Sequence, residues 1–441
     1  MRHATFGLLC LGFGLSASAG TLVVNDTGDA GPGDCAATCT LRDALASAAP
    51  GDTITFSPAL SYPATITLSG QELLIYKSLT IAGPGLDRLT VSGGNQSRVF
   101  EIANSATVTI QDLAIADGNE SGANGAPDFS GTTPPGNGGD AAGGAIYVNS
   151  GSSLLLADCD IHHNGASGGA GGPEISPGCS FAAGRGGSAA GGALYTAGDV
   201  IVRNCTFRSN QAAGGAGGDN LCISASAAGG AGGDAVGGAI AGSGQVELSN
   251  VTLAGNSAGG GSGGNGPYGG AGGNARGGAL SLDGFSVLEF VSSAGNTTSG
   301  SGGGFGTPPG PPGSATASDA LIGATVVARS SVLASTQTPS CQVDAGGIYA
   351  EGANLDRDGS CPGFTLHADP KLAPLGANVG GRYVMFPRPG SPLIDAALDC
   401  QDAFGGTVTT DELATPRPQG ARCDLGAVES DRLFGDGFDG S

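Results

Sequence analysis

A short polar segment, DCDIHHN at residues 158–164, carries the side chains of this sequence that are best suited to chemistry. Alternation along a strand would place Asp158, Asp160 and His162 on one side. Arg208 stands beside His162, at the matching position of the next copy of the repeat described below. Two carboxylates, an imidazole and a guanidinium could bind a sugar acid or move a proton.

The same pattern is also typical of a solvated strand face, on which polar side chains have no chemical role. The matching positions of neighbouring repeat copies hold Thr206, Thr252 and Ala254, which do not extend a catalytic set. We therefore predict no catalytic site, and the four residues above remain the enzymatic alternative.

A second polar segment, NLDRDGS at residues 354–360, has the spacing of the first half of a calcium-binding loop. Its candidate ligands are Asn354, Asp356 and Asp358, but Thr365 stands where such a loop has a bidentate Glu. We predict a polar turn here. We predict no zinc site, because the sequence contains no CxxC pair and only His162, His163 and His367 follow the signal. We also predict no cofactor.

The elements that would position these side chains come from a four-fold repeat. Its GGA signal begins at residues 143, 191, 237 and 277, so successive copies start 48, 46 and 40 residues apart. In each copy, a run of alternating apolar and polar residues leads to a shared Asn. Repeats of this length are typical of stacked coils or of propeller blades rather than of one globular core. The shared positions are Gly143, Gly144, Asn164, Gly191, Gly192, Asn210, Gly237, Gly238, Asn256, Gly277, Gly278 and Asn296.

Each shared residue type suits a chain that turns sharply and stacks on the coil before it. Paired Gly permits backbone conformations that other residues avoid, and Asn tolerates the left-handed region at a corner. Asn side chains in register can also hydrogen-bond along the stack as a ladder. The Gly-, Ala- and Ser-rich stretches after each Asn, such as 165–190 and 211–236, have little to bury. We predict that they are loops leaving the stack at one corner.

The GGA[IL] signal with its following Asn resembles the GGAI and FxxN repeats of polymorphic outer membrane proteins. Residues 207–210 match FxxN outright, whereas Ile161, Leu253 and Ser293 take the Phe position in the other copies, as expected of a variable inward residue. The resemblance implies a right-handed parallel β-helix over residues 143–298.

Both ends of the sequence resemble a group of exported bacterial β-helix proteins. CTLRDA at residues 39–44 is close to the CSLREA motif found near the start of these proteins. SPLIDAALDC at 391–400 and RPQGARCDLGAVE at 417–429 are similar to the segments that close them. The resemblance extends the expected fold, an all-β, single-stranded right-handed parallel β-helix, to nearly the whole chain.

A short helix is predicted at the CTLRDA motif. Thr40 and Asp43 form a near capping box, in which each side chain can bond to the backbone of the other residue. Apolar residues on one face of the helix could cover the open end of the stack, and these are Leu41, Ala44, Leu45 and Ala48.

The predicted organisation has five segments. Residues 1–19 have the charged start, apolar run and small-residue end of a secretory signal. An N-terminal cap at 20–49 precedes the β-helix at 50–340, and the last coils and C-terminal cap occupy 341–430. A short tail follows at 431–441. We therefore predict an exported protein, located extracellularly, at the outer cell surface or in the periplasm, with no membrane span.

Ten cysteines remain after the signal, an even number that favours disulfides in an oxidising compartment. The spacing pairs Cys35 with Cys39, Cys341 with Cys361, Cys400 with Cys423, Cys179 with Cys222, and Cys159 with Cys205. For Cys159 and Cys205, the alternative is a stack of unbonded thiols in the core.

The repeats, the secretory signal and the missing catalytic set together favour a non-enzymatic role. A net charge of −21 would repel nucleic acid and anionic membrane surfaces. We predict a non-enzymatic adhesive, matrix or envelope protein whose partners are glycans or surface components, without assigning an oligomeric state. The alternative is a polysaccharide lyase or glycoside hydrolase that acts on acidic polysaccharide, because such enzymes also use parallel β-helices.

Overall fold

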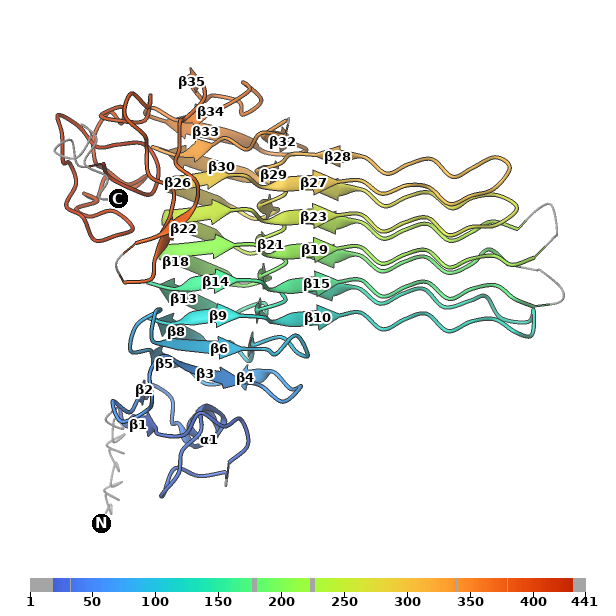
Figure 1. The fold of residues 1–441 in the computed structure, drawn as a ribbon, viewed down its shortest axis with the longest axis horizontal. Helices are drawn as coiled ribbons and strands as arrows, with labels where there is room; N and C mark the ends of the chain where they lie inside the picture. Colours follow the sequence, from blue (N-terminus) through green and yellow to red (C-terminus); the bar gives the residue numbers. More distant parts are fainter. Residues whose placement is uncertain are drawn as a thin grey trace, which may run out of the picture.

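The chain winds into a parallel β-helix whose coils stack from the N-terminal to the C-terminal end (Figure 1). This confirms the predicted fold class. The computed structural model describes residues 19–31, 33–176, 181–222, 227–337, 339–378 and 380–430. Most of the predicted signal and the whole of the predicted tail therefore lie outside the described residues.

Within the described residues, the longest sheet has 17 strands and runs along one side of the stack. Its strands are β1 (Thr21–Val24), β2 (Thr53–Phe56), β3 (Ala64–Thr67), β5 (Leu79–Ala82), β6 (Leu89–Ser92), β8 (Thr107–Gln111), β9 (Ala114–Ala116), β13 (Ser153–Ala157), β14 (Asp160–His162), β18 (Asp199–Arg208), β22 (Val246–Ala254), β26 (Ser286–Ala294), β30 (Thr325–Arg329), β31 (Val332–Leu333), β33 (Gly347–Glu351), β34 (Leu355–Asp356) and β35 (Leu366–His367).

The other parallel sheets of the described chain complete the coils. One has eight strands: β4 (Leu73–Ile75), β7 (Phe100–Ile102), β12 (Ile146–Val148), β17 (Leu194–Thr196), β21 (Ile240–Gly242), β25 (Leu280–Leu282), β29 (Ala320–Ile322) and β32 (Cys341–Val343). Two have five strands each: β10 (Asn119–Ser121), β15 (Gly165–Ser167), β19 (Gln211–Ala213), β23 (Ser257–Gly259) and β27 (Thr297–Ser299); and β11 (Ala141–Ala142), β16 (Ala189–Ala190), β20 (Ala235–Val236), β24 (Ala275–Arg276) and β28 (Ala315–Thr316). An antiparallel pair, β36 (Gly376–Ala377) and β37 (Tyr383–Val384), lies in the C-terminal segment.

The core is a narrow column of aliphatic side chains stacked in register. Val108, Leu154, Val200 and Val246 follow one another on successive coils and are at most 2% exposed. Each buried aliphatic side chain of this size contributes about 1.5–3 kcal/mol. The alternation of apolar and polar residues along each strand thus determines which side of the strand faces the core.

The helix α1 (Leu41–Ser47) covers the N-terminal end of the column, as predicted. Thr40 Oγ1 accepts a hydrogen bond from the Asp43 backbone N–H at 3.2 Å. Asp43 Oδ2 accepts one from the Thr40 backbone N–H at 3.1 Å, so the capping box is complete. The helix packs against β1 and β4 with the predicted apolar face, and the buried residues are Leu41, Ala44, Leu45 and Ala48.

The GGA signal forms a corner of the coil at every repeat. The first Gly has a left-handed backbone, with φ of 65° at Gly143 and 61–64° at the equivalent positions. The second Gly lies against the next coil, because a Cβ on Gly144 would stand 2.4 Å from the Gly192 carbonyl oxygen. The Ala that follows is fully buried in each copy.

The shared Asn residues form the predicted ladder inside the stack. In each bond of the ladder, the Nδ2 of one Asn donates to the Oδ1 of the Asn on the next coil at 3.0 Å. The bonds run from Asn164 to Asn210, from Asn210 to Asn256, and from Asn256 to Asn296. Every rung also bonds to the backbone. Asn210 Nδ2, for example, donates to the Ile161 carbonyl oxygen at 3.0 Å.

The prediction that these Asn residues adopt a left-handed backbone conformation is wrong. The residue before each Asn takes that conformation instead, and these residues are His163, Ser209, Gly255 and Gly295, with φ of 55–71°. The turn is completed one residue early because the Asn side chain has to point inward to reach the ladder. A second left-handed corner lies six residues before each Asn, at Asp158, Asn204, Asn250 and Phe290.

The glycine-rich stretches leave the stack at one corner, as predicted, but they are not irregular loops. They run outward and return as five stacked layers that project from the β-helix (Figure 1). We call this projection the glycine arm, formed by the described parts of residues 122–140, 168–188, 214–234, 260–274 and 300–314.

Hydrogen bonds in the glycine arm repeat every three residues. Gly168 N–H donates to Ala213 O in the next layer at 2.8 Å, and Gly169 N–H donates across the arm to Gly139 O at 2.9 Å. Ala170 N–H points outward and donates to the Asn124 side chain at 2.9 Å. A three-residue period is that of a polyproline II helix. The arm is thus held by its backbone rather than by an apolar core.

The three-residue period of the glycine arm also explains its composition. Of every three residues, two face an adjacent segment, and these two are often Gly. A Cβ on Gly187 or Gly261 would stand 1.9 Å from a carbonyl oxygen of an adjacent segment. The outward position has no such limit, since a Cβ on Gly302 would meet nothing within 4 Å.

Two prolines lie at the edge of the arm, in the part of its last layer that runs back to the β-helix. In the layer below, Gly269 and Gly272 donate their N–H groups to the last layer at 3.1 and 2.9 Å. Pro309 and Pro312 stand one repeat later, where such N–H groups would point beyond the last layer. Because proline has no N–H, this part of the edge presents no unpaired donors.

Replacement of Gly261 by Ala should loosen the arm, whereas replacement of Gly302 by Ala should not. The first change forces a Cβ against the Gly215 carbonyl oxygen, and we expect a loss of about 1–3 kcal/mol in the free energy of local opening. The second should stay within about 0.5 kcal/mol. Hydrogen exchange of the arm amides measures both values, and equal effects of the two changes would contradict the packed arrangement.

Candidate functional site

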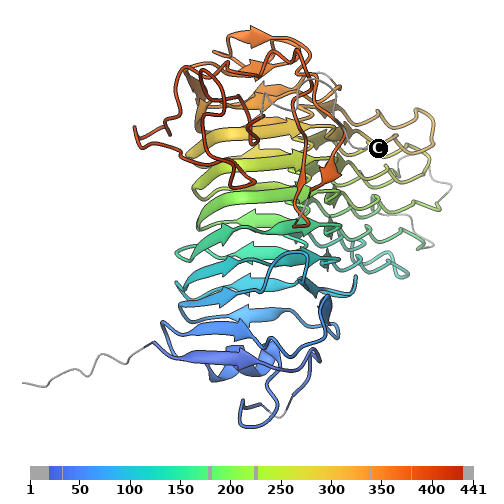
Figure 2. The same ribbon diagram turned by 60° about the vertical axis from the view of Figure 1, so that its left-hand side comes forward.

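The C-terminal segment runs back over the outer face of the 17-stranded sheet (Figure 2). We call residues 382–430 the C-terminal cover. It contacts β18 through Thr206, whose hydroxyl donates to the Tyr383 carbonyl oxygen at 2.7 Å. It contacts β22 through Asn250, which donates to the Thr410 carbonyl oxygen at 3.0 Å. The sequence-predicted catalytic candidates lie at the edge of this contact.

Asp160 and Arg208 form a tight ion pair beneath the cover. Arg208 Nε lies 3.0 Å from Asp160 Oδ1, and Arg208 Nη2 lies 2.9 Å from Asp160 Oδ2. The guanidinium also stacks on the Tyr383 ring, 3.9 Å from its centroid. Burial raises the pKa of Asp160, although Arg208 opposes this shift. Asp160 is therefore engaged with Arg208, and Arg208 is engaged with both Asp160 and the cover.

His162 lies beside this pair and is uncharged at neutral pH. Its Nε2 atom is 3.8 Å from Asp160 Oδ2, and its Nδ1 atom is 2.9 Å from Nδ1 of His163. Burial, together with the positive charges of Arg208 and His163, lowers the pKa of His162 to about 3. An imidazole with so low a pKa is a weak base at pH 7.

Asp158 stands apart from the strand on which it was expected. It occupies a left-handed corner before β14 and forms an ion pair with Arg382 of the cover. The structure therefore brings Asp160, His162 and Arg208 together, with Arg208 in register with His162 as predicted, whereas Asp158 pairs with Arg382 instead. The sequence analysis missed Arg382 and Tyr383, because they lie outside the repeat and no periodic signal marks them.

Glu412 anchors the cover by a fully buried carboxyl group. Its Oε2 accepts a hydrogen bond from the Thr252 hydroxyl at 2.6 Å. Its Oε1 lies 2.8 Å from the Thr206 hydroxyl oxygen, whose own hydrogen goes to the Tyr383 carbonyl oxygen, so a protonated Oε1 would donate to Thr206. Burial raises the pKa of Glu412 to about 8, despite these bonds. The group is thus mostly protonated at neutral pH, which avoids the cost of an unpaired buried charge.

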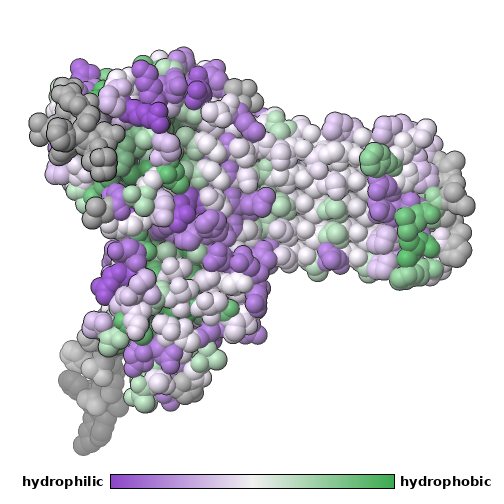
Figure 3. All heavy atoms as spheres, viewed as in Figure 1, coloured by the Kyte–Doolittle hydropathy of each residue, from purple (hydrophilic) through white to green (hydrophobic). Residues whose placement is uncertain are grey.

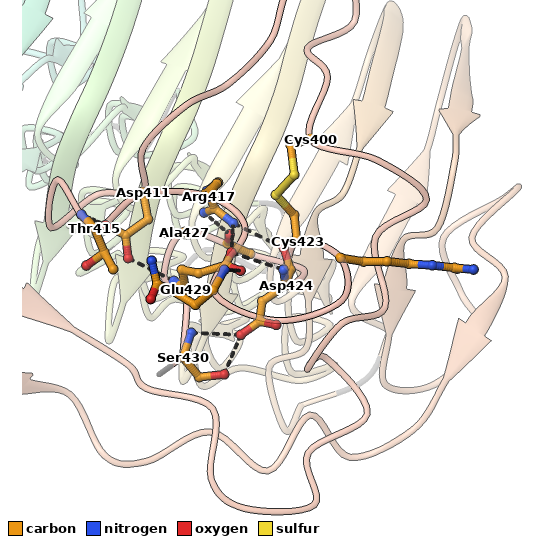
Figure 4. A network of polar contacts seen from close by, with 12 residues as sticks. Cys400, Asp411, Thr415, Arg417, Cys423, Asp424, Ala427, Glu429 and Ser430 are labelled. Carbon is orange, nitrogen blue, oxygen red and sulfur yellow. Dashed lines mark hydrogen bonds and ion pairs between the residues drawn. A yellow bond between two sulfur atoms is a disulfide. The ribbon is translucent and has the colours of Figure 1, made fainter. Parts of the chain in front are cut away.

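Arg417 is the centre of a second buried network (Figure 4). Its Nη1 atom lies 2.9 Å from Glu429 Oε2, and its Nη2 atom donates to Asn250 Oδ1 at 3.2 Å. The guanidinium also stacks on the Phe290 ring, 4.2 Å from the centroid. This arrangement links the RP and CDLGAVE segments to the outside of the sheet.

Three of the predicted disulfides are confirmed: Cys35–Cys39, Cys341–Cys361 and Cys400–Cys423. Cys222 is also disulfide-bonded, and its predicted partner Cys179 lies outside the described residues.

The predicted Cys159–Cys205 disulfide is wrong, and the alternative of stacked free thiols holds. Both side chains are buried, and the Cys159 backbone N–H donates to Cys205 Sγ at 3.3 Å. The two residues lie in register on neighbouring parallel coils, so their side chains leave the backbone in the same direction. A disulfide needs side chains that converge.

The predicted polar turn is only partly present, because Asn354 precedes β34, Asp356 lies on β34 and Asp358 lies in the bend that follows it. Asn354 is buried, and its Oδ1 accepts the Ser331 backbone N–H at 2.9 Å. Asp356 accepts the Cys361 N–H at 2.9 Å and contacts His367, while Asp358 accepts the Ser340 N–H at 3.0 Å. In the described part of the chain, no group of three or more His, Cys, Asp and Glu side chains could hold a metal ion.

The outer end of the glycine arm exposes large apolar side chains. Figure 3 shows hydrophobic surface there, next to hydrophilic surface and beyond a shaft of nearly neutral hydropathy. We call this the tip patch, formed by Phe129, Leu221, Tyr268 and Phe305, which are 41–83% exposed. The repeat gave no signal for the patch, since each residue stands in a part of the sequence that differs between copies.

Comparison with known proteins gives no family. No protein-family model matches the sequence, and no curated protein matches it. Among solved structures, the chain is similar to a crystal structure of the pectate lyase Pel9A, with 16% sequence identity and a TM-score of 0.34 over 93% of this chain and 97% of that chain. The resemblances to polymorphic outer membrane proteins and to CSLREA-motif proteins stay predictions. None of the described helical segments has the length and apolar character needed to cross a membrane.

Docking of the cover should weaken as pH rises from about 4.5 to about 8. The pKa of Glu412 is raised from 4.5 to about 8 in the folded protein. The folded state therefore binds a proton that the unfolded state has lost in this range, and stability falls with rising pH. Glu412→Gln, which mimics the protonated acid, should keep the docking and reduce its pH dependence.

Hydrogen exchange of the cover amides between pH 5 and pH 8, corrected for the intrinsic exchange rate, measures this effect. Asp199→Asn is a matched control, because Asp199 is exposed on the same sheet outside the cover contacts. An unchanged pH dependence in Glu412→Gln would show that Glu412 does not control the docking.

Proposed function

We propose that the protein is an exported, non-enzymatic adhesive protein whose β-helix holds the glycine arm outward and whose tip patch binds glycans or other surface components. The observation that carries this proposal is the pairing of a backbone-bonded arm with exposed large apolar side chains at its end.

The tip patch has the physical properties of a binding surface. Large apolar groups that gather on an exposed surface commonly mark interaction sites, and aromatic side chains dominate binding energies. The stacked layers hold the patch in place before it meets a ligand, so little ordering entropy is lost on binding. A flexible loop of the same composition would lack this advantage.

The cysteine chemistry supports export. Three disulfides join described cysteines, including Cys400–Cys423 within the cover. Disulfides persist mainly in oxidising compartments such as the periplasm or the cell exterior. This agrees with the secretory signal read from residues 1–19.

Polar replacements at the tip should reduce adhesion without unfolding the arm. The triple variant Phe129→Ser, Leu221→Ser, Phe305→Ser should lower binding to cells and to an immobilised glycan array at least tenfold, because it removes the apolar contact area. Binding assays on the purified proteins give this ratio.

The matched control replaces three exposed apolar residues of the β-helix and cover, in the variant Leu74→Ser, Tyr349→Ser, Leu398→Ser. This protein should bind like the wild type. Wild-type binding by the tip variant, with arm hydrogen exchange intact, would overturn the adhesive role of the tip.

The second candidate function is cleavage of acidic polysaccharide, favoured by the meeting of Asp160, His162 and Arg208 at one place. It predicts product release from polygalacturonate or alginate, measured by absorbance and reducing ends with and without Ca²⁺. Asp160→Asn and His162→Ala should each remove at least nine-tenths of that activity. Equal turnover in the variants would exclude this cluster as the catalytic site.

A further inference from the structure

A pocket of about 360 Å³ lies between the cover and the outer face of the sheet. Its floor comes from β18, β22 and β26, and its rim comes from residues 402–410 of the cover. Arg203, Ser249 and Glu289 stand in register on three consecutive coils of this floor. The pocket is separate from the Asp160–Arg208 pair and from the tip patch.

Glu289 is the buried acid of this pocket, and only one of its oxygens is used. The residue is 2% exposed, and its Oε1 accepts the Ala403 backbone N–H at 2.7 Å. Its Oε2 has no hydrogen-bond partner in the described part of the protein, although the side chain lines the pocket. In Glu412, by contrast, both oxygens are bonded to threonines. Glu289 thus keeps one carboxyl oxygen without a bond at the pocket.

Phe404 provides an aromatic surface at the rim of the same pocket. Its side chain is 71% exposed. The turn that carries it is held by Asp402, whose Oδ1 accepts the Phe404 N–H at 2.9 Å and the Gly406 N–H at 2.7 Å. The Cys400–Cys423 disulfide fixes the turn at its base. The ring is therefore presented on a constrained loop, which suits a flat apolar ligand face.

The charges of the pocket select against acidic ligands. Glu247, Glu289 and Asp402 line it together with one cation, Arg203, which already pairs with Glu247 at 3.1 Å. Burial and the negative charges of Asp402 and Glu247 raise the pKa of Glu289 to about 7. A hydroxyl group can donate to the carboxylate or accept from the carboxylic acid, so it suits both forms. A ligand carboxylate would be repelled.

We propose that this pocket binds a neutral sugar residue of a polysaccharide, with one sugar face on the Phe404 ring and a hydroxyl hydrogen-bonded to Glu289 Oε2. Phe404 supplies the apolar contact, and Glu289 supplies a directional polar contact. A sugar ring offers both an apolar C–H face and hydroxyl groups at its edge. The site goes beyond adhesion through the tip, because it lies on the β-helix and uses different residues.

Affinity electrophoresis and calorimetry with soluble neutral polysaccharides test the site. The probes are mixed-linkage β-glucan, galactomannan, xylan and dextran, with polygalacturonate as the acidic comparison. We expect at least one neutral probe to bind and polygalacturonate to bind at least tenfold more weakly. Preference for polygalacturonate, or retardation by none of the neutral probes, would overturn the proposal.

Variants locate the binding. Phe404→Ala and Glu289→Ala should each weaken binding of the neutral probe about tenfold, whereas Glu289→Gln, which keeps a hydrogen-bonding group, should stay within about threefold. Tyr349→Ala is the matched control, because Tyr349 is an exposed aromatic residue that does not line the pocket. Wild-type affinity in Phe404→Ala would exclude this pocket. Retention of binding by the tip variant would separate this site from the adhesive tip.

Discussion

Stacking in register is the constraint on which the rest of this structure depends. Successive coils lie about 4.8 Å apart, so each repeated residue must fit against a copy of itself above and below. The Asn ladder satisfies this condition by bonding from one amide to the next. The second Gly of each GGA signal satisfies it by leaving room for the neighbouring carbonyl oxygen. Interior aliphatic residues satisfy it by packing on one another.

The glycine arm applies the same constraint to a chain without a core. Small residues bury too little apolar surface to stabilise a projection, but they allow close approach of one backbone to another. Every third N–H then bonds to the next layer and every third bonds across the arm. This regular hydrogen-bond pattern stops at the tip of the arm, where the sequence no longer repeats. The tip differs between layers, and its four large apolar residues are 41–83% exposed.

The cover shows how burial changes the chemistry of acidic side chains on one surface. Asp160 is neutralised by Arg208, and Glu412 is kept protonated between two threonines. Glu412 bonds the cover to the sheet directly, and Asp160 acts through Arg208, so both acids have few atoms left for a ligand. Glu289 lies under the same cover with one oxygen unbonded, beside an aromatic rim. The distinction between a structural acid and a candidate binding acid lies in this remaining acceptor.

The sequence by itself determined the features that are local or repeated. The capping box at Thr40 and Asp43, the inward aliphatic alternation and the Asn ladder follow from residue type and period, because each depends on near neighbours or on equivalent positions. The tertiary structure alone decided the arm layers, the free state of Cys159 and Cys205, and the position of the cover. Arg382 meets Asp158 and Glu412 meets Thr206 across 224 and 206 residues. Such contacts join unrepeated segments to repeated ones, so no period in the sequence encodes them.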